Sequence, residues 1–124
     1  GRLREGSDEA RYELAFDVVA RDVNQYLAVV RDEHDEVVGT MQLTIIPGLS
    51  RAGTTRLQVE GVRVRTDVRS LGLGSAMLGW AHQHGRARGA TLAQLTTDTS
   101  RTQAHAFYAR LGYEQSHVGL KRQL

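Results

Sequence analysis

The stretch that decides the fold is Val62-Arg63-Val64-Arg65-Thr66-Asp67-Val68-Arg69-Ser70-Leu71-Gly72-Leu73-Gly74-Ser75-Ala76. It starts as an alternating strand, passes through a loop with two glycines two residues apart, and opens directly into a helical pattern. Glycines let a backbone approach an anion closely, and the free N–H groups of a helix start attract it. Arg69 adds a positive charge. A phosphate-binding turn is one interpretation of this stretch; a plain turn with a solvated Arg69 is the other.

Two common phosphate loops do not fit this stretch. A P-loop needs Lys-Ser or Lys-Thr directly after its last glycine, whereas Gly74 is followed by Ser75 and Ala76. A dinucleotide fingerprint needs a small third residue, and Met77 stands there. The strands before the loop also form an antiparallel series where a βαβ unit should begin.

The rest of the chain is interpreted outward from this stretch. Upstream, the patterns predict a helix over residues 7–20 and strands over 26–31, 36–46 and 55–65, with a turn at 32–35 and a bulge at Gly61. Downstream, they predict helices over 75–88 and 101–111, a strand over 92–97, and two short strands over 113–117 and 119–124. The apolar face of the 75–88 helix is assigned to Met77, Trp80, Ala81 and His84. This order predicts an α/β (α+β) domain with a mixed, largely antiparallel sheet flanked by helices.

Composition narrows the class of protein. The chain has 124 residues, no cysteine, and 16 basic against 14 acidic residues. Disulfides and cysteine nucleophiles are therefore excluded, and no metal site is predicted. The slight basic excess favours a phosphate-bearing ligand over nucleic acid. The apolar runs fall short of the ~20 residues that cross a bilayer, so we expect no membrane partner and a cytoplasmic location.

A second motif adds to the first. Ala104-His105-Ala106-Phe107-Tyr108 is followed by Gly112-Tyr113. Together with Arg69-x-x-Gly72-x-Gly74 it resembles the GNAT superfamily of acetyl-CoA-dependent N-acetyltransferases. The resemblance covers the chain from about residue 43 to its C-terminus, and the pair of motifs is more specific than either alone.

The resemblance implies acetyl-CoA as cosubstrate and direct transfer of the acetyl group to a primary amine in a ternary complex. The strand backbone at Val62, Arg63 and Val64 would pair with the pantetheine arm. The pyrophosphate would lie on the amides of Arg69, Ser70, Leu71, Gly72, Leu73, Gly74 and Ser75. Tyr108 would lie near the sulfur and protonate the leaving thiolate, since a phenol with pKa ~10 stays protonated where a thiol has pKa ~8.5.

Glu60 is the candidate base that would deprotonate the amine, directly or through water. On an alternating strand it shares a face with Val62 and Val64, so a partly buried carboxylate is expected. A structural salt bridge explains Glu60 equally well. Asp98 is a rival base, and a mechanism with no base is a third alternative.

Two features depart from the family pattern. Arg101 stands where the family often has Asn, which puts a side-chain contact to the pantetheine in doubt. The family's opening strand and first helix have no room before residue 25, so we expect residues 1–124 to form one N-terminally short domain.

The remaining candidates are weaker. His82 and His84 cannot face one ligand from a helix, and His105 lies one turn before Tyr108. The basic side chains Arg51, Arg56 and Arg63 are solvated charges or ligands for a carboxylate on the acceptor. A non-catalytic acyl-CoA-binding sensor or interaction module is the alternative function. Nucleic-acid binding ranks last, and a homodimer is compatible with so small a domain.

Overall fold

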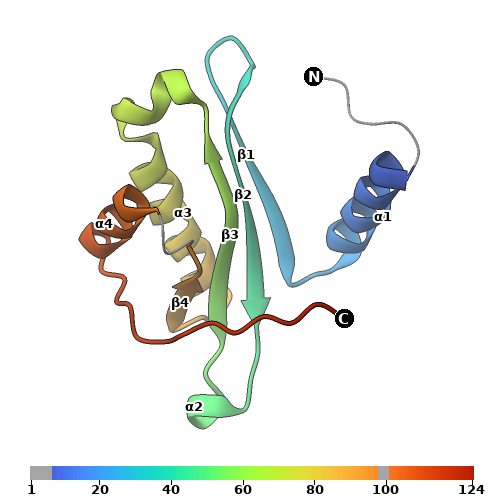
Figure 1. Cartoon of the computed structure of the whole chain (residues 1–124), viewed down its shortest axis with the longest axis vertical. Coiled ribbons are helices and arrows are strands. Elements are labelled where there is room, and N and C mark those ends of the chain that lie inside the picture. Colours follow the sequence, from blue (N-terminus) through green and yellow to red (C-terminus); the bar gives the residue numbers. More distant parts are fainter. Residues whose placement is uncertain (1–6, 98–100) are drawn as a thin grey trace.

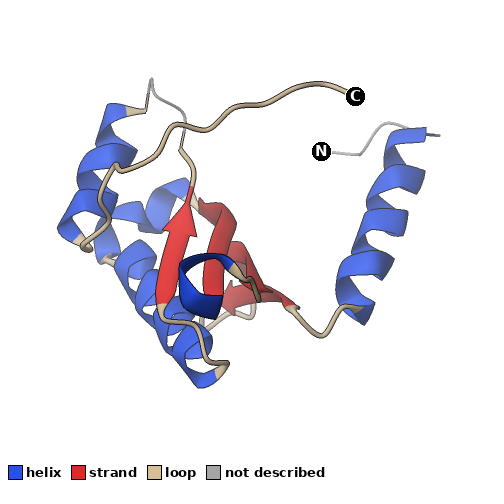
Figure 2. Cartoon of the chain, turned by 90° about the horizontal axis from the view of Figure 1, so that it is seen from below, coloured by secondary structure: helices blue, strands red, loops and turns tan. Residues whose placement is uncertain are grey.

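The computed structural model describes residues 7–97 and 101–124, which form a sheet with helices on both sides (Figures 1 and 2). In chain order the elements are α1 (Ser7–Arg21), β1 (Gln25–Arg31), β2 (Val37–Ile46), α2 (Ser50–Gly53), β3 (Arg56–Val64), the 3-10 helix η1 (Thr66–Leu71), α3 (Leu73–Ala87), β4 (Leu92–Leu95) and α4 (Thr102–Arg110). The predicted mixed α/β architecture is confirmed.

The sheet has the order β1-β2-β3-β4. β1, β2 and β3 form an antiparallel meander, and β4 joins β3 in parallel through the α3 crossover. The predicted turn closes the first hairpin, where the Asp32 N–H donates to the Glu36 carbonyl at 2.8 Å. A parallel pair joined by a helix is the expected result of a strand–loop–helix–strand order.

One face of the sheet carries the hydrophobic core. Leu43, Leu57 and Val59 point from β2 and β3 toward α3, which buries Leu78 and Ala81 against them. The helix can approach closely because Gly85 has no side chain. A Cβ at this position would lie only 3.0 Å from Leu57 Cδ2. This close packing fixes α3, and with it the loop at its start, against the middle of the sheet.

The face of α3 differs from the sequence prediction. Met77 and Ala81 are buried as expected, together with Leu78 and Gly85. Trp80 is 46% exposed, and it stacks on His84 with ring centroids 5.4 Å apart. The helix is therefore rotated so that its aromatic residues lie at the flank, because the sheet leaves room only for small and aliphatic side chains beneath it.

The opposite face of the sheet is polar. Gln25, Gln42 and Thr44 alternate with the core residues of β1 and β2, and Gln25 Oε1 accepts from both Gln42 Nε2 (3.0 Å) and Thr44 Oγ1 (2.8 Å). α1 lies on this side, away from α3 and α4 (Figure 2). The side chains of Tyr12 and Phe16 on α1 are 63% and 59% exposed. Because the polar side chains of Gln25, Gln42 and Thr44 hydrogen-bond to one another, this face of the sheet can be in contact with water and does not need α1 packed over it.

The two predicted C-terminal strands are wrong. Residues 113–124 have no regular secondary structure and run as an irregular segment past the sheet (Figure 1). The side chains of Val118 and Leu120 are 87% and 92% exposed, so the apolar residues of this segment do not form a buried face. A strand also needs a neighbour for its N–H and C=O groups, and the segment pairs with none of the described strands.

The predicted loop after β2 contains a turn of unusual conformation. Arg51 and Ala52 both have positive φ, at 53° and 60°, within the one-turn element α2.

Among the described residues, no helix has the length and apolarity that crossing a bilayer requires.

Candidate active site

The strands β3 and β4 separate partway along their length. Their parallel pairing runs from Arg56–Leu92 to Val59–Leu95, but β3 continues to Val64. The last five residues of β3 therefore extend beyond the described end of β4 and leave a backbone edge that does not pair with it. Such an edge can hydrogen-bond to an extended amide-containing chain.

A bulge lies at the start of that free stretch. Thr40 pairs with Arg63 and Gln42 pairs with Glu60, so Gly61 and Val62 together oppose Met41. Gly61 has φ 63°, which a glycine adopts without strain. The predicted bulge at Gly61 is confirmed.

The bulge overturns one expectation about Glu60. Because the extra residue shifts the alternation, Val62 and Val64 turn toward the core while Glu60 lies on the polar face. Glu60 is exposed and does not share a face with the two valines as expected. Alternation after the buried Val59 puts this carboxylate on the polar face, and the bulge moves the two valines to the core face.

The loop after β3 begins the α3 helix through a left-handed glycine. Gly72 has φ 78° and ψ 12°, and α3 begins at Leu73, two residues earlier than the sequence predicts. The first helical bond runs from the Ala76 N–H to the Gly72 carbonyl at 3.2 Å. The N–H groups of Leu73, Gly74 and Ser75 thus belong to the first turn of α3, for which α3 itself supplies no acceptor carbonyl. Residues 69–71 form the end of η1. The predicted loop, residues 69–74, therefore lies entirely at the start of α3.

Arg69 is placed at the junction of strand and loop. Its Nε donates to the Val64 carbonyl at 3.1 Å, at the last residue of β3. This bond uses one of the five N–H donors of the guanidinium. The exposed side chain therefore keeps donors for an anion at the free end of β3.

Tyr108 lies on α4 and is partly buried; like Val62 and Val64 at the end of β3, it packs against the hydrophobic core. Burial raises the pKa of its phenol, and the nearby Arg101 acts against that rise. Phe107 belongs to the core as predicted, and a Cβ on Gly74 would lie 3.3 Å from its Cζ. The structure thus places the start of α3 against the tyrosine helix, and this helix and the free end of β3 pack against the same core.

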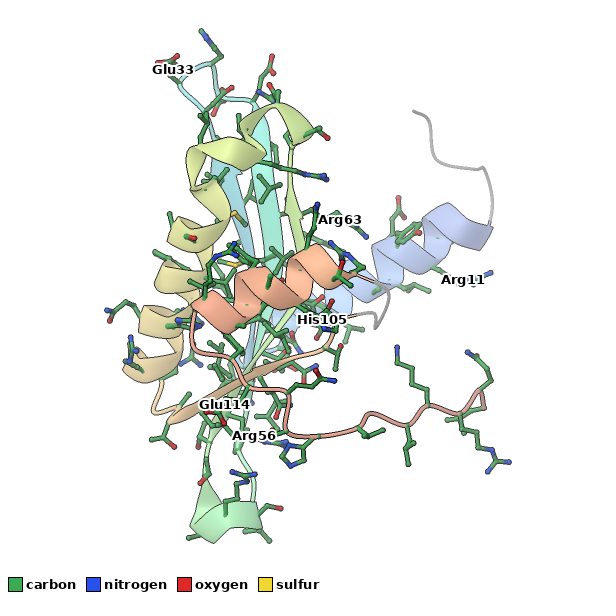
Figure 3. The ribbon with its side chains drawn as sticks, turned by 60° about the vertical axis from the view of Figure 1, so that its left-hand side comes forward. Arg11, Glu33, Arg56, Arg63, His105 and Glu114 are labelled. Atoms are coloured by element: carbon green, nitrogen blue, oxygen red, sulfur yellow. The ribbon has the colours of Figure 1, made fainter. Side chains whose placement is uncertain are left out.

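The polar face holds a chain of hydrogen bonds around Glu60. Arg56 Nη1 donates to Gln94 Oε1 (3.2 Å), Gln94 Nε2 to Gln58 Oε1 (2.8 Å), and Gln58 Nε2 to Glu60 Oε1 (3.5 Å). Arg63 lies on the same face. In Figure 3 Arg56 lies toward the α2 end of the strand, with Arg63 toward the other end. A carboxylate and two guanidinium groups therefore share the surface of one strand.

Sequence reasoning missed one pair of residues close to Tyr108. His82 Nε2 lies 2.7 Å from the Tyr113 hydroxyl, and the rings of Tyr113 and Tyr108 meet edge to face at 5.8 Å. The sequence placed Tyr113 in its second motif but gave no signal for His82. His84 instead contacts Tyr26, so the two histidines face different partners as expected.

Other candidates are less informative. Asp98, the rival base, lies outside the described residues. His105 is partly buried on α4 (Figure 3). Arg51 is exposed in the turn after β2. Among the residues described, no three histidine or acidic side chains gather where they could hold a metal ion.

An apolar cleft of about 360 Å³ lies between α3 and the β1–β2 hairpin. It is lined by Tyr26, Ala28, Val29, Val30, Met41, Leu73, Ala76, Met77 and Trp80. None of these side chains carries a charge, so the cleft does not suit a pyrophosphate. It adjoins the loop through Leu73 alone, and Tyr108 is not among the residues that line it.

Comparison with known proteins agrees with this geometry. A sequence model of the acetyltransferase (GNAT) family matches residues 2–113. The chain is 36% identical over 89 residues to an aminoalkylphosphonate N-acetyltransferase of Salmonella typhimurium strain LT2. That match covers 72% of this chain and 57% of the relative's length, so the chain spans little more than half of that protein.

Solved structures show the same fold. A transcriptional regulator from Bacillus halodurans C-125 superposes with a TM-score of 0.87 at 39% identity, over 93% of this chain and 76% of its own. A putative acetyltransferase from Agrobacterium tumefaciens strain C58 has a TM-score of 0.82 at 22% identity, over 100% and 83% of the two chains. With the family match over most of its length, the chain belongs to the GNAT family of acetyltransferases.

Proposed function

We propose that this protein transfers the acetyl group of acetyl-CoA to a primary amine by direct attack in a ternary complex. The observation that carries the proposal is the free end of β3, which leads through Arg69 and Gly72 into the first turn of α3. That turn lies against Phe107 of α4, the helix that also carries Tyr108. Membership of the acetyltransferase family supports acetyl transfer, and the sites below are our assignment.

Acetyl-CoA would bind along this junction. The backbone of Val62, Arg63 and Val64 would pair with the amides of the pantetheine arm. The pyrophosphate would lie on the N–H groups of residues 69–75, with the Arg69 guanidinium beside it. The fit rests on Gly72, whose positive φ turns the chain into the first turn of α3 and whose Cβ position is open; Gly74 lets that turn pack against Phe107.

The chemistry needs a proton taken from the amine and one given to the thiolate. Glu60 would accept the ammonium proton, directly or through water. The amine nitrogen then attacks the thioester carbonyl and an N–C bond forms. The nitrogen of the tetrahedral intermediate loses its second proton to solvent as the C–S bond breaks, and a proton from solvent later restores the phenol of Tyr108. Tyr108 would donate its proton to the departing sulfur, and the burial that raises its pKa keeps it protonated until then.

The acceptor we propose is an amine that also carries an anionic group. Arg63 and Arg56 share a strand face with Glu60, so an ammonium and an anion could be recognised on one surface. The similarity to an aminoalkylphosphonate N-acetyltransferase supports phosphonates as the first class to test.

The first experiment measures the melting temperature of the full chain with acetyl-CoA, free CoA or ATP. A ligand at about 100 times its dissociation constant stabilises a protein by about 2.7 kcal/mol. We expect a rise with acetyl-CoA and with CoA but none with ATP. No rise with either would refute the assigned binding loop.

The second experiment measures thiol release with an acceptor panel. Aminoethylphosphonate, β-alanine and ethanolamine share a short amine arm that ends in a phosphonate, a carboxylate and an uncharged hydroxyl. We expect the two amines with an anionic end group to be turned over faster, and Arg63→Gln to remove that preference. Tyr108→Phe should lower kcat while the acetyl-CoA affinity is unchanged.

Binding of acetyl-CoA without release of thiol from any amine would instead favour a non-catalytic acyl-CoA sensor or interaction module. Thiol release that is equally fast with ethanolamine would contradict the anionic acceptor. The cytoplasmic location, the single domain and a homodimer stay predictions.

A further inference from the structure

The His82–Tyr113 pair joins two helices that the proposed reaction uses. His82 lies in the middle of α3, whose first turn is assigned to the pyrophosphate, and Tyr113 lies directly after α4, which carries Tyr108. Their hydrogen bond is 2.7 Å long and partly buried, and the two rings lie 5.6 Å apart.

Tyr113 is in turn tied to Tyr108 through the end of α4. The Tyr113 N–H donates to the Tyr108 carbonyl at 3.0 Å, and the Gly112 N–H donates to the Ala109 carbonyl at 3.0 Å. Gly112 has φ 91°. These bonds form a Schellman motif, in which the residue after the glycine commonly packs on the side chain five positions before it. Here that contact is the edge-to-face pair of Tyr113 and Tyr108.

The protonation states agree with a bond donated by the phenol. Burial raises the pKa of Tyr113 to about 12. Burial and then Arg86 lower the pKa of His82. At neutral pH the Tyr113 hydroxyl is therefore protonated and His82 is neutral, which suits a bond from the phenol to an unprotonated Nε2.

We propose that His82 is a positioning residue for the reaction: through Tyr113 it fixes the ring of Tyr108 relative to the helix that holds the cosubstrate. The contacts run from α3 through one hydrogen bond and one ring contact to the general acid. The inference rests on the proposed function, in which Tyr108 protonates the thiolate. Without the bond, the Tyr113 ring can rotate and Tyr108 loses a packing partner on one side.

The test uses variants that remove or restore the acceptor atom. His82→Phe keeps a ring of similar size but cannot accept a hydrogen bond, and Tyr113→Phe removes the donor. His82→Gln restores an acceptor at the end of a side chain of similar reach. His84→Phe is the matched control, because His84 lies on the same helix, is also partly buried, and faces Tyr26 and Trp80 instead.

We expect His82→Phe and Tyr113→Phe each to lower kcat about tenfold, the scale on which a small displacement of a catalytic group acts. The KM for acetyl-CoA should stay within about twofold, because the groups that bind it are untouched. The double variant should lose no more than either single one. His82→Gln should recover most of kcat, and His84→Phe should leave it unchanged.

The decisive comparison is made in the Tyr108→Phe background, where His82→Phe should have no further effect on kcat. All rates are measured well below each melting temperature and referred to the concentration of acetyl-CoA sites. The positioning role is refuted if His82→Phe lowers only the melting temperature, or if it lowers kcat as much in the Tyr108→Phe background as in the parent protein. Either result leaves the proposed acetyltransferase activity intact. If Tyr108→Phe itself leaves kcat unchanged, the assigned acid fails, and the role of His82 fails with it.

Discussion

Gly72 is the residue where the proposed binding loop is most open to a clean test. Its φ of 78° and ψ of 12° lie in the left-handed region, and a Cβ placed on it meets no atom within 4 Å. Gly72→Ala therefore creates no clash, and only the backbone conformation opposes it. A left-handed conformation costs an alanine about 1–2 kcal/mol, so we expect the free energy of unfolding to fall by that amount.

Gly79→Ala is the matched control. Gly79 also has open space around its Cβ, but it lies inside α3 and has no positive φ. An alanine in a helix interior is about 1 kcal/mol better than a glycine, so this variant should be more stable than the parent protein. The two identical chemical changes should thus act in opposite directions and differ by about 2–3 kcal/mol.

The assay is urea unfolding of both variants, with midpoints compared at a constant slope. On heating, each kcal/mol corresponds to about 4 °C for a domain near this size. Acetyl-CoA affinity should fall in Gly72→Ala and stay unchanged in Gly79→Ala. If Gly72→Ala is as stable as Gly79→Ala, then Gly72 does not hold a left-handed conformation and the reasoning about this helix start is wrong.

Three further predictions concern stability. Ala52→Gly should raise the free energy of unfolding by about 0.5–1 kcal/mol and with it the urea midpoint, because φ at Ala52 is 60° and a glycine adopts it freely; an unchanged midpoint would contradict that turn. Leu78→Ala should cost about 3 kcal/mol, because Leu78 is 0% exposed beneath the sheet; a loss below about 1 kcal/mol would contradict the packing of α3. The Arg65–Asp67 ion pair, with Nε–Oδ1 at 2.6 Å, lowers the pKa of the Asp67 carboxyl, chiefly through the side-chain hydrogen bond. The stabilisation that this ion pair gives the folded state is present above the pKa of Asp67 in the unfolded chain, and it is lost as the pH falls through the lower pKa of the folded state. The free energy of unfolding of Asp67→Asn should therefore differ from that of the parent near about pH 6 and match it below about pH 2. A difference that persists in acid would exclude this cause.

Much of the fold could be predicted because its signals are local. Alternation predicted β2 and β3, and the bulge at Gly61 followed from a glycine within a strand pattern. The α3 helix was predicted from its period and from the glycine that follows it. Its rotation was not, because which residues lie underneath depends on the small space that Gly85 leaves over Leu57.

The features that sequence reasoning missed depend on register and on distant partners. A bulge at Gly61 was predicted, but its effect on the residues after it was not. One extra residue moves every later side chain to the other face, so Val62 and Val64 lie on the face opposite to Glu60. The C-terminal strands were predicted from alternation, yet a strand also needs a free neighbouring edge. The His82–Tyr113 bond joins residues 31 apart in the chain and has no local signature.

The chain of hydrogen bonds from Arg56 to Glu60 has a direction. Each glutamine amide accepts through its oxygen on the side of Arg56 and donates through its nitrogen toward Glu60. The two amide dipoles are therefore aligned between a cation and an anion, and the end charges fix which way both amides turn. A charge bound or neutralised near Arg56 would thus change the hydrogen bonding of a carboxylate four residues along the strand, with no movement of the backbone.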